Sequence, residues 1–289
     1  MTARTHPCEN VTSLQHANAT LTCMDAGWGR VERGDAEIWF YETAGDRPLL
    51  VLLHGLAGYA REWGATIESL RTEYRVVAIE QRGHGGSTRR PDDVTREAYV
   101  ADVVAVLDDL GAGSVPIVGH SMGGHTAMLV AARHPDRVER LVMLESGLGG
   151  EDPEVTRAVG DWLGNWPVPF ADRDDFLAFF GGDRMVAESW ADGLEQRPDG
   201  LYPQWDACTL QRALAHLHHH EHVADWADVV APTMLVRGEH GAVSVREVDS
   251  MLALHPDLEV RTIPGAGHDV HLDAPDVWSR LLSGFLTTS

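Results

Sequence analysis

The chain of 289 residues contains no lysine, because all 23 of its basic residues are arginine. Schiff-base catalysis and the phosphate-binding lysine of a Walker loop both need a primary amine, so both chemistries are excluded. The basic residues are outnumbered by 44 acidic ones, which gives a formal net charge of −21. Nucleic acids and anionic membrane surfaces attract clustered positive charge, so we expect neither as a partner.

Cysteine is scarce, and long apolar runs are missing. The three cysteines, Cys8, Cys23 and Cys208, are too widely spaced for a disulfide framework or a zinc site, so we interpret them as reduced thiols. No apolar run approaches the roughly 18 residues that span a bilayer. The first residues lack the basic start and apolar stretch of a signal peptide. We therefore expect a cytoplasmic protein.

Short apolar runs alternate with amphipathic stretches along most of the chain. Nearly continuous aliphatic runs, typical of parallel strands buried on both faces, occupy residues 49–53, 76–79, 115–118, 141–144 and 234–236. Residues 100–110 have helical spacing and end at Gly111. A final helix is predicted from about Asp273, with Pro275 in its first turn. This alternation predicts an α/β fold with a mostly parallel central sheet flanked by helices.

Residues 147–226 interrupt this pattern. They contain no convincing buried strand, yet they hold five of the nine tryptophans and four of the six phenylalanines. We interpret this segment as a helical cap over the carboxyl edge of the sheet, where open α/β sheets bind ligands. The core then comprises residues 30–146 and 227–289, after an N-terminal extension of residues 1–29. Most cap aromatics should pack together, but a few should bind substrate, and the candidates are Trp166, Trp190 and Trp205.

The strongest local motif is Gly119-His120-Ser121-Met122-Gly123-Gly124, between the run at 115–118 and a helix-like stretch. A G-x-S-x-G sequence in this context is typical of a nucleophile elbow, a sharp turn that lifts the serine hydroxyl above the sheet. Glycines are needed at both ends because a Cβ atom would collide across the turn. We therefore predict that Ser121 is a catalytic nucleophile.

Two further loops complete the predicted site. His268 ends the sequence Gly265-Ala266-Gly267-His268, between a short run at 258–263 and the final helix, where the chain order serine, acid, histidine places a general base. The loop His54-Gly55-Leu56-Ala57-Gly58 follows residues 49–53 and can aim a backbone N–H at a developing oxyanion. We assign the oxyanion donors to Leu56 and Met122. Gly55 is a near alternative and a candidate substrate contact, whereas His54 is interpreted as structural.

Together these segments resemble the α/β-hydrolase superfamily from about Glu37 to the C-terminus. The matching stretches are His54-Gly55, Arg82-Gly83-His84-Gly85-Gly86-Ser87, residues 119–124, and Gly267-His268 with Asp273-Ala274-Pro275. The resemblance implies the α/β-hydrolase fold, a cap after the sixth strand and a catalytic triad. It implies no cofactor and no metal.

The triad acid departs from the pattern of the superfamily. Relatives usually carry Asp shortly after the strand expected at 234–236, but this chain has Gly241 there. Without an acid the imidazole is poorly oriented, and turnover falls by about four orders of magnitude. Glu145 directly follows the run at 141–144, where haloalkane dehalogenases and zearalenone-type lactone hydrolases keep their acid. We therefore favour Glu145 over Glu239, which stands on the usual loop.

The serine at position 121 narrows the chemistry, because related dehalogenases and epoxide hydrolases use a carboxylate there. We predict a serine hydrolase that cleaves a carboxylic ester or lactone of a bulky apolar small molecule through an acyl-enzyme on Ser121. Two alternatives stay open: a C–C bond hydrolase with the same triad, and a ligand receptor on a hydrolase scaffold. Whether the protein is a monomer or a homodimer also stays open.

A run of histidines in the predicted cap invites a metal-site interpretation. On a helix its members would lie one turn apart in pairs. No third ligand with suitable spacing follows, so we expect a solvated cap surface without a metal. The run comprises His216, His218, His219, His220 and His222.

Overall fold

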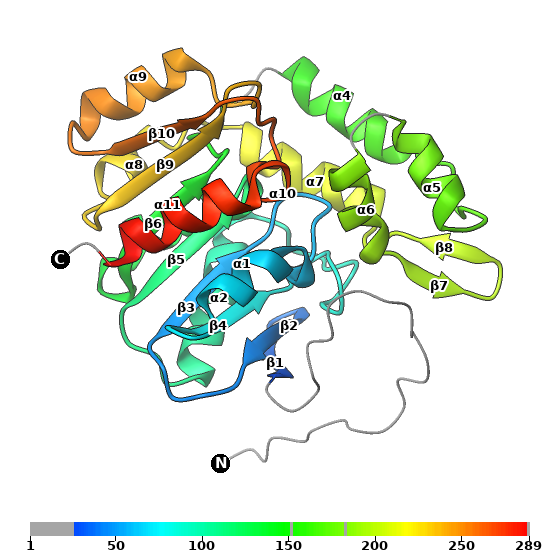
Figure 1. The fold of residues 1–289 in the computed structure, drawn as a ribbon, viewed down its shortest axis with the longest axis horizontal. Coiled ribbons are helices and arrows are strands. Elements are labelled where there is room, and N and C mark those ends of the chain that lie inside the picture. Colours follow the sequence, from blue (N-terminus) through cyan, green and yellow to red (C-terminus); the bar gives the residue numbers. More distant parts are fainter. Residues whose placement is uncertain (1–25, 151–152, 182–183, 288–289) are drawn as a thin grey trace.

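The computed structural model describes residues 26–150, 153–181 and 184–287. Its centre is an eight-stranded sheet in the order β1-β2-β4-β3-β5-β6-β9-β10 (Figure 1). From β4 to β10 neighbouring strands are parallel, whereas β1 and β2 pair antiparallel at one edge. The strands are β1 (Ala26–Arg33), β2 (Ala36–Thr43), β3 (Leu49–Leu53), β4 (Arg75–Ile79), β5 (Val115–His120), β6 (Val138–Leu144), β9 (Thr233–Gly238) and β10 (Glu259–Ile263).

Helices cover both faces of the sheet, and each face has its own apolar core. Along β3 the side chains alternate: Val51 and Leu53 belong to one core, Leu50 and Leu52 to the other. Burial on both faces explains the continuous aliphatic runs of the parallel strands. The first core includes α2 (Arg96–Asp109), α3 (Met122–Arg133), α8 (Val223–Ala227) and α9 (Val245–Leu254). The second includes α1 (Gly64–Leu70), α10 (Val270–Asp273) and α11 (Pro275–Thr287).

The segment between β6 and β9 lies beyond the carboxyl ends of the parallel strands (Figure 1). An aromatic cluster with buried Trp166, Phe170 and Phe176 forms a core of its own. The segment thus packs largely on itself, while its role as a cap stays a prediction. Its elements are α4 (Pro153–Gly164), α5 (Arg173–Phe180), α6 (Arg184–Asp192), the hairpin β7 (Glu195–Arg197) and β8 (Gly200–Tyr202), and α7 (Ala207–His218), followed by α8.

The predicted strands and helices are found, but the N-terminal boundary is wrong. The predicted extension of residues 1–29 is too long, because residues 26–29 pair with residues 40–43 in the β1–β2 ladder. β1 lacks a continuous apolar run, and the run Ile38–Tyr41 in β2 is mostly aromatic rather than aliphatic. Residues 1–25 lie outside the described residues. Among the helices of the described ranges, none is long and apolar enough to cross a membrane.

Candidate active site

Ser121 lies in a strained turn between β5 and α3. Its backbone has φ +51° and ψ −118°, a region that residues with a side chain rarely adopt. A Cβ atom at position 119 would overlap the carbonyl oxygen of Gly123, and one at position 123 would overlap that of Leu53. The elbow therefore closes only with glycine at both positions, as the motif predicts.

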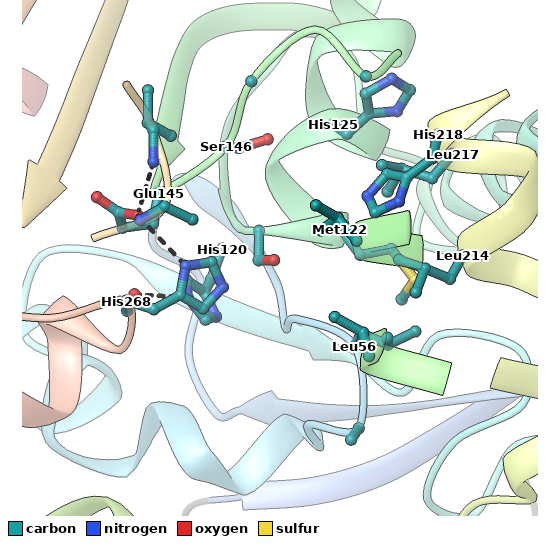
Figure 2. A pocket seen from close by; sticks show the side chains of 18 of the residues that line it. Leu56, His120, Met122, His125, Glu145, Ser146, Leu214, Leu217, His218 and His268 are labelled. Atoms are coloured by element: carbon teal, nitrogen blue, oxygen red, sulfur yellow. Dashed lines mark hydrogen bonds and ion pairs between the residues drawn. The ribbon is translucent and has the colours of Figure 1, made fainter. Parts of the chain in front are cut away.

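Glu145, directly after β6, lies against the predicted base. Its side chain is buried, and one carboxylate oxygen accepts a hydrogen bond from the backbone N–H of Gly238 at 2.7 Å. The other accepts one from Ala242 at 2.6 Å and lies 3.3 Å from Nδ1 of His268 (Figure 2). A carboxylate only accepts, so Nδ1 carries the hydrogen and Nε2 holds the lone pair of the neutral ring. Nε2 is thus the atom that can take a proton.

The alternative acid points elsewhere. Glu239 is exposed, and its carboxylate accepts a hydrogen bond from the backbone N–H of Gly265 at 2.9 Å. A Cβ atom at position 241 would overlap the carboxylate of Glu145. The glycine at position 241 and the glutamate at position 145 therefore depend on each other, because the carboxylate occupies the space that a side chain at position 241 would need.

The surroundings of His268 favour its protonated form. Burial by itself lowers the pKa of the imidazole, but the hydrogen bond to Glu145 and the negative charge of Asp269 outweigh it, so the pKa lies above 6.5. Among the described residues the structure records no hydrogen bond between the Ser121 hydroxyl and His268. Catalytic hydrogen bonds often tighten only when substrate binds.

The predicted oxyanion donors border the same cavity as Ser121. Met122 is the first residue of α3, so its N–H has no acceptor in the preceding turn of the helix. Leu56 lies on a loop that is fixed by a hydrogen bond of 3.2 Å from the N–H of Ala57 to Nε2 of His84. The donor role of Leu56 and Met122 stays a prediction. His54 is buried and bonded to neighbouring backbone, in agreement with a structural role.

A cavity of about 560 Å³ opens onto Ser121 and His268. The catalytic side contributes Leu56, Met122, Glu145 and Asp269, among others. The segment between β6 and β9 contributes mainly apolar side chains. Those from its helices are Val155, Val159, Trp162, Leu163, Trp190, Leu214, Leu217 and His218.

Of the four predicted substrate contacts, one lines this cavity and three do not, while their contact with substrate stays a prediction. Trp190 lines the cavity, whereas Trp166 and Trp205 do not. Those two rings stack edge-to-face at 4.8 Å and are 6 % and 8 % exposed, because they belong to the aromatic core of the segment. Gly55 is not among the lining residues either. It packs against His120, so closely that a Cβ atom at position 55 would lie 2.8 Å from Nδ1 of that ring. Trp162, which lines the cavity, is not marked by any spacing in the sequence.

The histidine run is only partly a solvated surface. His216, His219 and His220 are exposed, but His218 turns into the cavity (Figure 2). Its Nδ1 lies 2.7 Å from Oγ1 of Thr156, and burial lowers the pKa of His218 to about 4. His218 is therefore a neutral polar group in an otherwise mostly apolar wall, which the spacing of the run does not predict.

Comparison with known proteins identifies the family. The profile of the alpha/beta hydrolase fold family matches residues 48–275, and the chain belongs to that family. It is 26 % identical over 260 residues to the 2-(acetamidomethylene)succinate hydrolase of Mesorhizobium japonicum, covering 84 % of this chain and 89 % of that protein. It is 25 % identical over 258 residues to a putative esterase/lipase of Haemophilus influenzae, covering 83 % of each.

Solved structures show the same fold. A crystal structure of E-2-(acetamidomethylene)succinate hydrolase superposes with a TM-score of 0.84 at 24 % identity, over 91 % of this chain and 100 % of that one. The relatives act as hydrolases and esterases by name, so the fold and a hydrolase family are shared. At this identity a shared fold does not determine the reaction or the substrate.

Proposed function

We propose that this protein is a serine hydrolase that cleaves a carboxylic ester or lactone of a neutral, bulky and largely apolar small molecule. The proposal is based on the arrangement of Ser121, His268 and Glu145, which all line one cavity. Within it the carboxylate of Glu145 is hydrogen-bonded to Nδ1 of His268. Residues 147–226 act as the cap that closes this cavity.

The reaction follows from the positions of these groups. Nε2 of His268 takes the hydroxyl proton while Oγ of Ser121 attacks the carbonyl carbon, and the buried Glu145 carboxylate stabilises the imidazolium. Backbone N–H groups of Leu56 and Met122 bind the oxyanion of the tetrahedral intermediate. The imidazolium then protonates the leaving alcohol, and water, activated by the same histidine, hydrolyses the acyl-enzyme.

The cavity wall supports a neutral substrate. Among the described lining residues none is arginine, and the chain has no lysine, whereas three carboxylates border the space: Glu145, Glu247 and Asp269. A substrate anion would find no arginine or lysine there and would be repelled by the carboxylates. The succinate derivative in the name of one relative is anionic, so we do not extend that substrate to this protein.

Short p-nitrophenyl esters and a fluorophosphonate probe test the proposal together. We expect sustained steady-state turnover and one covalent adduct per chain, which peptide mapping places on Ser121 and which Ser121→Ala lacks. An adduct without sustained turnover would favour a ligand receptor on a hydrolase scaffold. Turnover of β-diketones in preference to esters would favour C–C bond hydrolysis, and a fully active Ser121→Ala variant would overturn the assignment.

A further inference from the structure

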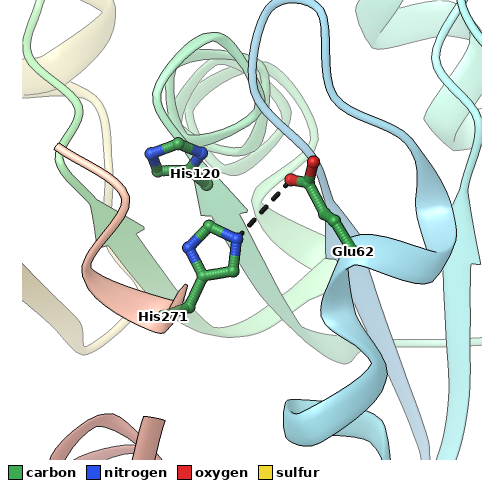
Figure 3. A group of neighbouring side chains, drawn as sticks. All are labelled: Glu62, His120 and His271. Carbon is green, nitrogen blue, oxygen red and sulfur yellow. Dashed lines mark ion pairs between the residues drawn. The ribbon is translucent and has the colours of Figure 1, made fainter. Parts of the chain in front are cut away.

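Behind the proposed catalytic groups lies a second cluster, formed by Glu62, His120 and His271 (Figure 3). One possible ligand atom from each residue lies within 4.8 Å of the others. The residues are only 7 %, 3 % and 2 % exposed. They come from three separate places: the 3-10 turn Ala60–Trp63, the end of β5 and the short helix α10.

His120 presents one free lone pair to this cluster. Its Nε2 lies 3.0 Å from the carbonyl oxygen of His268, which can only accept, so Nε2 carries the ring hydrogen. Nδ1 is then the basic nitrogen, and it is buried without a hydrogen-bond partner in the described part of the chain. A histidine that donates one N–H to a backbone carbonyl and offers its other nitrogen is the usual arrangement around protein-bound metals.

Glu62 and His271 complete the donor set. Oε2 of Glu62 accepts a hydrogen bond of 3.2 Å from the N–H of Tyr59, which orients the carboxylate, and Oε1 lies 3.6 Å from Nε2 of His271. That separation is long for a hydrogen bond. It suits two ligands of one tetrahedral zinc ion, which lie about 3.4 Å apart when each is about 2.1 Å from the ion.

Burial also disfavours the charged forms of the three side chains. Burial raises the pKa of Glu62 to about 8, because the carboxylate has left water without gaining a fixed cation. Its ion-pair partner among the described residues is His271, whose own pKa burial lowers to about 4. The pKa of His120 is also lowered by burial. Nδ1 of His120 and both ring nitrogens of His271 are buried without a hydrogen-bond partner in the described part of the chain.

We propose that Glu62, His120 and His271 form a binding site for a divalent transition-metal ion of the zinc type. Two imidazoles and one carboxylate are a common zinc ligand set and leave a fourth position for water. His120 and Asp269 also line the cavity, which gives the ion a route from solvent. The site lies outside the acyl-transfer chemistry and does not depend on the proposed function.

The ion would hold together the three segments that carry the catalytic groups. Glu62 follows the loop of the predicted oxyanion donor Leu56, His120 precedes Ser121, and His271 follows His268 by three residues. Binding to the folded state alone raises stability with the logarithm of the free ion concentration. The expected role is therefore to stiffen the catalytic loops.

The test compares chelator-treated protein with and without added Zn²⁺. We expect about one zinc per chain by elemental analysis and a rise in Tm of ~5 °C or more at a hundredfold excess over Kd. Glu62→Gln keeps the shape of the side chain and removes the charge, so this variant should lose both the bound zinc and the rise in Tm. The matched control is the double variant His219→Gln with His220→Gln, which removes exposed histidines and should keep both.

Cobalt provides a readout that does not depend on any variant. Co²⁺ added to the metal-free wild type should give the intense visible absorption of a four-coordinate ion, and Zn²⁺ should displace it. Wild-type protein that binds neither ion, or binding that survives Glu62→Gln and disappears in the histidine control, would overturn the proposal. The first result would leave the cluster a neutral polar network, and the second would place the metal on the surface.

Discussion

The floor and the roof of the cavity are built by different means. The floor, comprising the turns at Ser121 and Glu145 and the loop at His268, is fixed by backbone geometry. Ser121 and Glu145 both have positive φ, and Glu145 is bound by three backbone N–H groups. The roof, comprising α4, α6 and α7, is fixed by side-chain packing, in which the rings of Trp162, Trp166 and Trp190 contact one another.

This difference determines what a substitution does. A change in the floor has to be matched by a change at the residue it contacts, because glycine contacts and backbone hydrogen bonds leave no spare space. In the roof many aromatic contacts remain when one side chain is replaced. Such a change therefore alters the shape of the cavity more than the catalytic groups. The floor should therefore control whether reaction occurs, and the roof should control which substrate reacts.

The largest effect is expected from the floor. Ser121→Ala and His268→Ala should each lower kcat by about a millionfold, and the double variant should lose little more, because the two residues act as a unit. The steady-state rate on a p-nitrophenyl ester is the measurement, with circular dichroism to verify the fold. Effects that multiply would show that the two residues work independently.

The second prediction concerns the space shared by residues 145 and 241. Gly241→Asp should lower the free energy of unfolding by about 1–3 kcal/mol, because the new side chain overlaps the carboxylate of Glu145. Adding Glu145→Gly removes the overlap, suits the positive φ at 145 and places the acid on the usual loop. The free energy of unfolding, measured in urea, and kcat should both recover in the double variant. Additive losses would contradict the shared space.

The same comparison explains what the sequence could predict. The floor was predictable because its residues are marked locally: a glycine-bounded serine after an apolar run, a histidine before the last helix, and a glycine at 241 with a glutamate at 145. β1 and β2 were not, because neither contains a continuous aliphatic run. The packing of the helices decides that Trp162 rather than Trp166 lines the cavity, and the sequence does not reveal that packing. The Glu62 cluster joins residues without any common spacing.

A third prediction distinguishes the roles of Trp162, which lies in α4, and Trp166, which lies in the loop after α4. Trp166→Ala should lower the free energy of unfolding by about 3–5 kcal/mol, because it empties the aromatic core. Trp162→Ala should change stability less, since its side chain is 40 % exposed, and should lower kcat/KM about tenfold for bulky esters only. Thermal unfolding and a paired series of long and short esters measure both. Equal losses on all esters with Trp162→Ala would indicate a damaged fold.

The fourth prediction is a pH effect. The base must be neutral, so kcat/KM should fall as the pH drops through the pKa of His268, with a midpoint above 6.5. Glu145→Gln removes the charge and the hydrogen bond that raise this pKa, so the midpoint should move to lower pH in the activity that remains. A midpoint that stays in place would mean that Glu145 does not act on His268.

The most direct test of the account compares kcat of Glu145→Gln with that of Glu239→Gln on one p-nitrophenyl ester, at a pH where His268 is neutral. We expect a fall of roughly two to four orders of magnitude for Glu145→Gln, because the buried carboxylate orients the base and stabilises its protonated form. Glu239→Gln should stay within a few-fold of the wild type, since Glu239 binds the backbone of Gly265 at the surface. A large loss in Glu239→Gln with an active Glu145→Gln would place the acid on the usual loop and contradict the account.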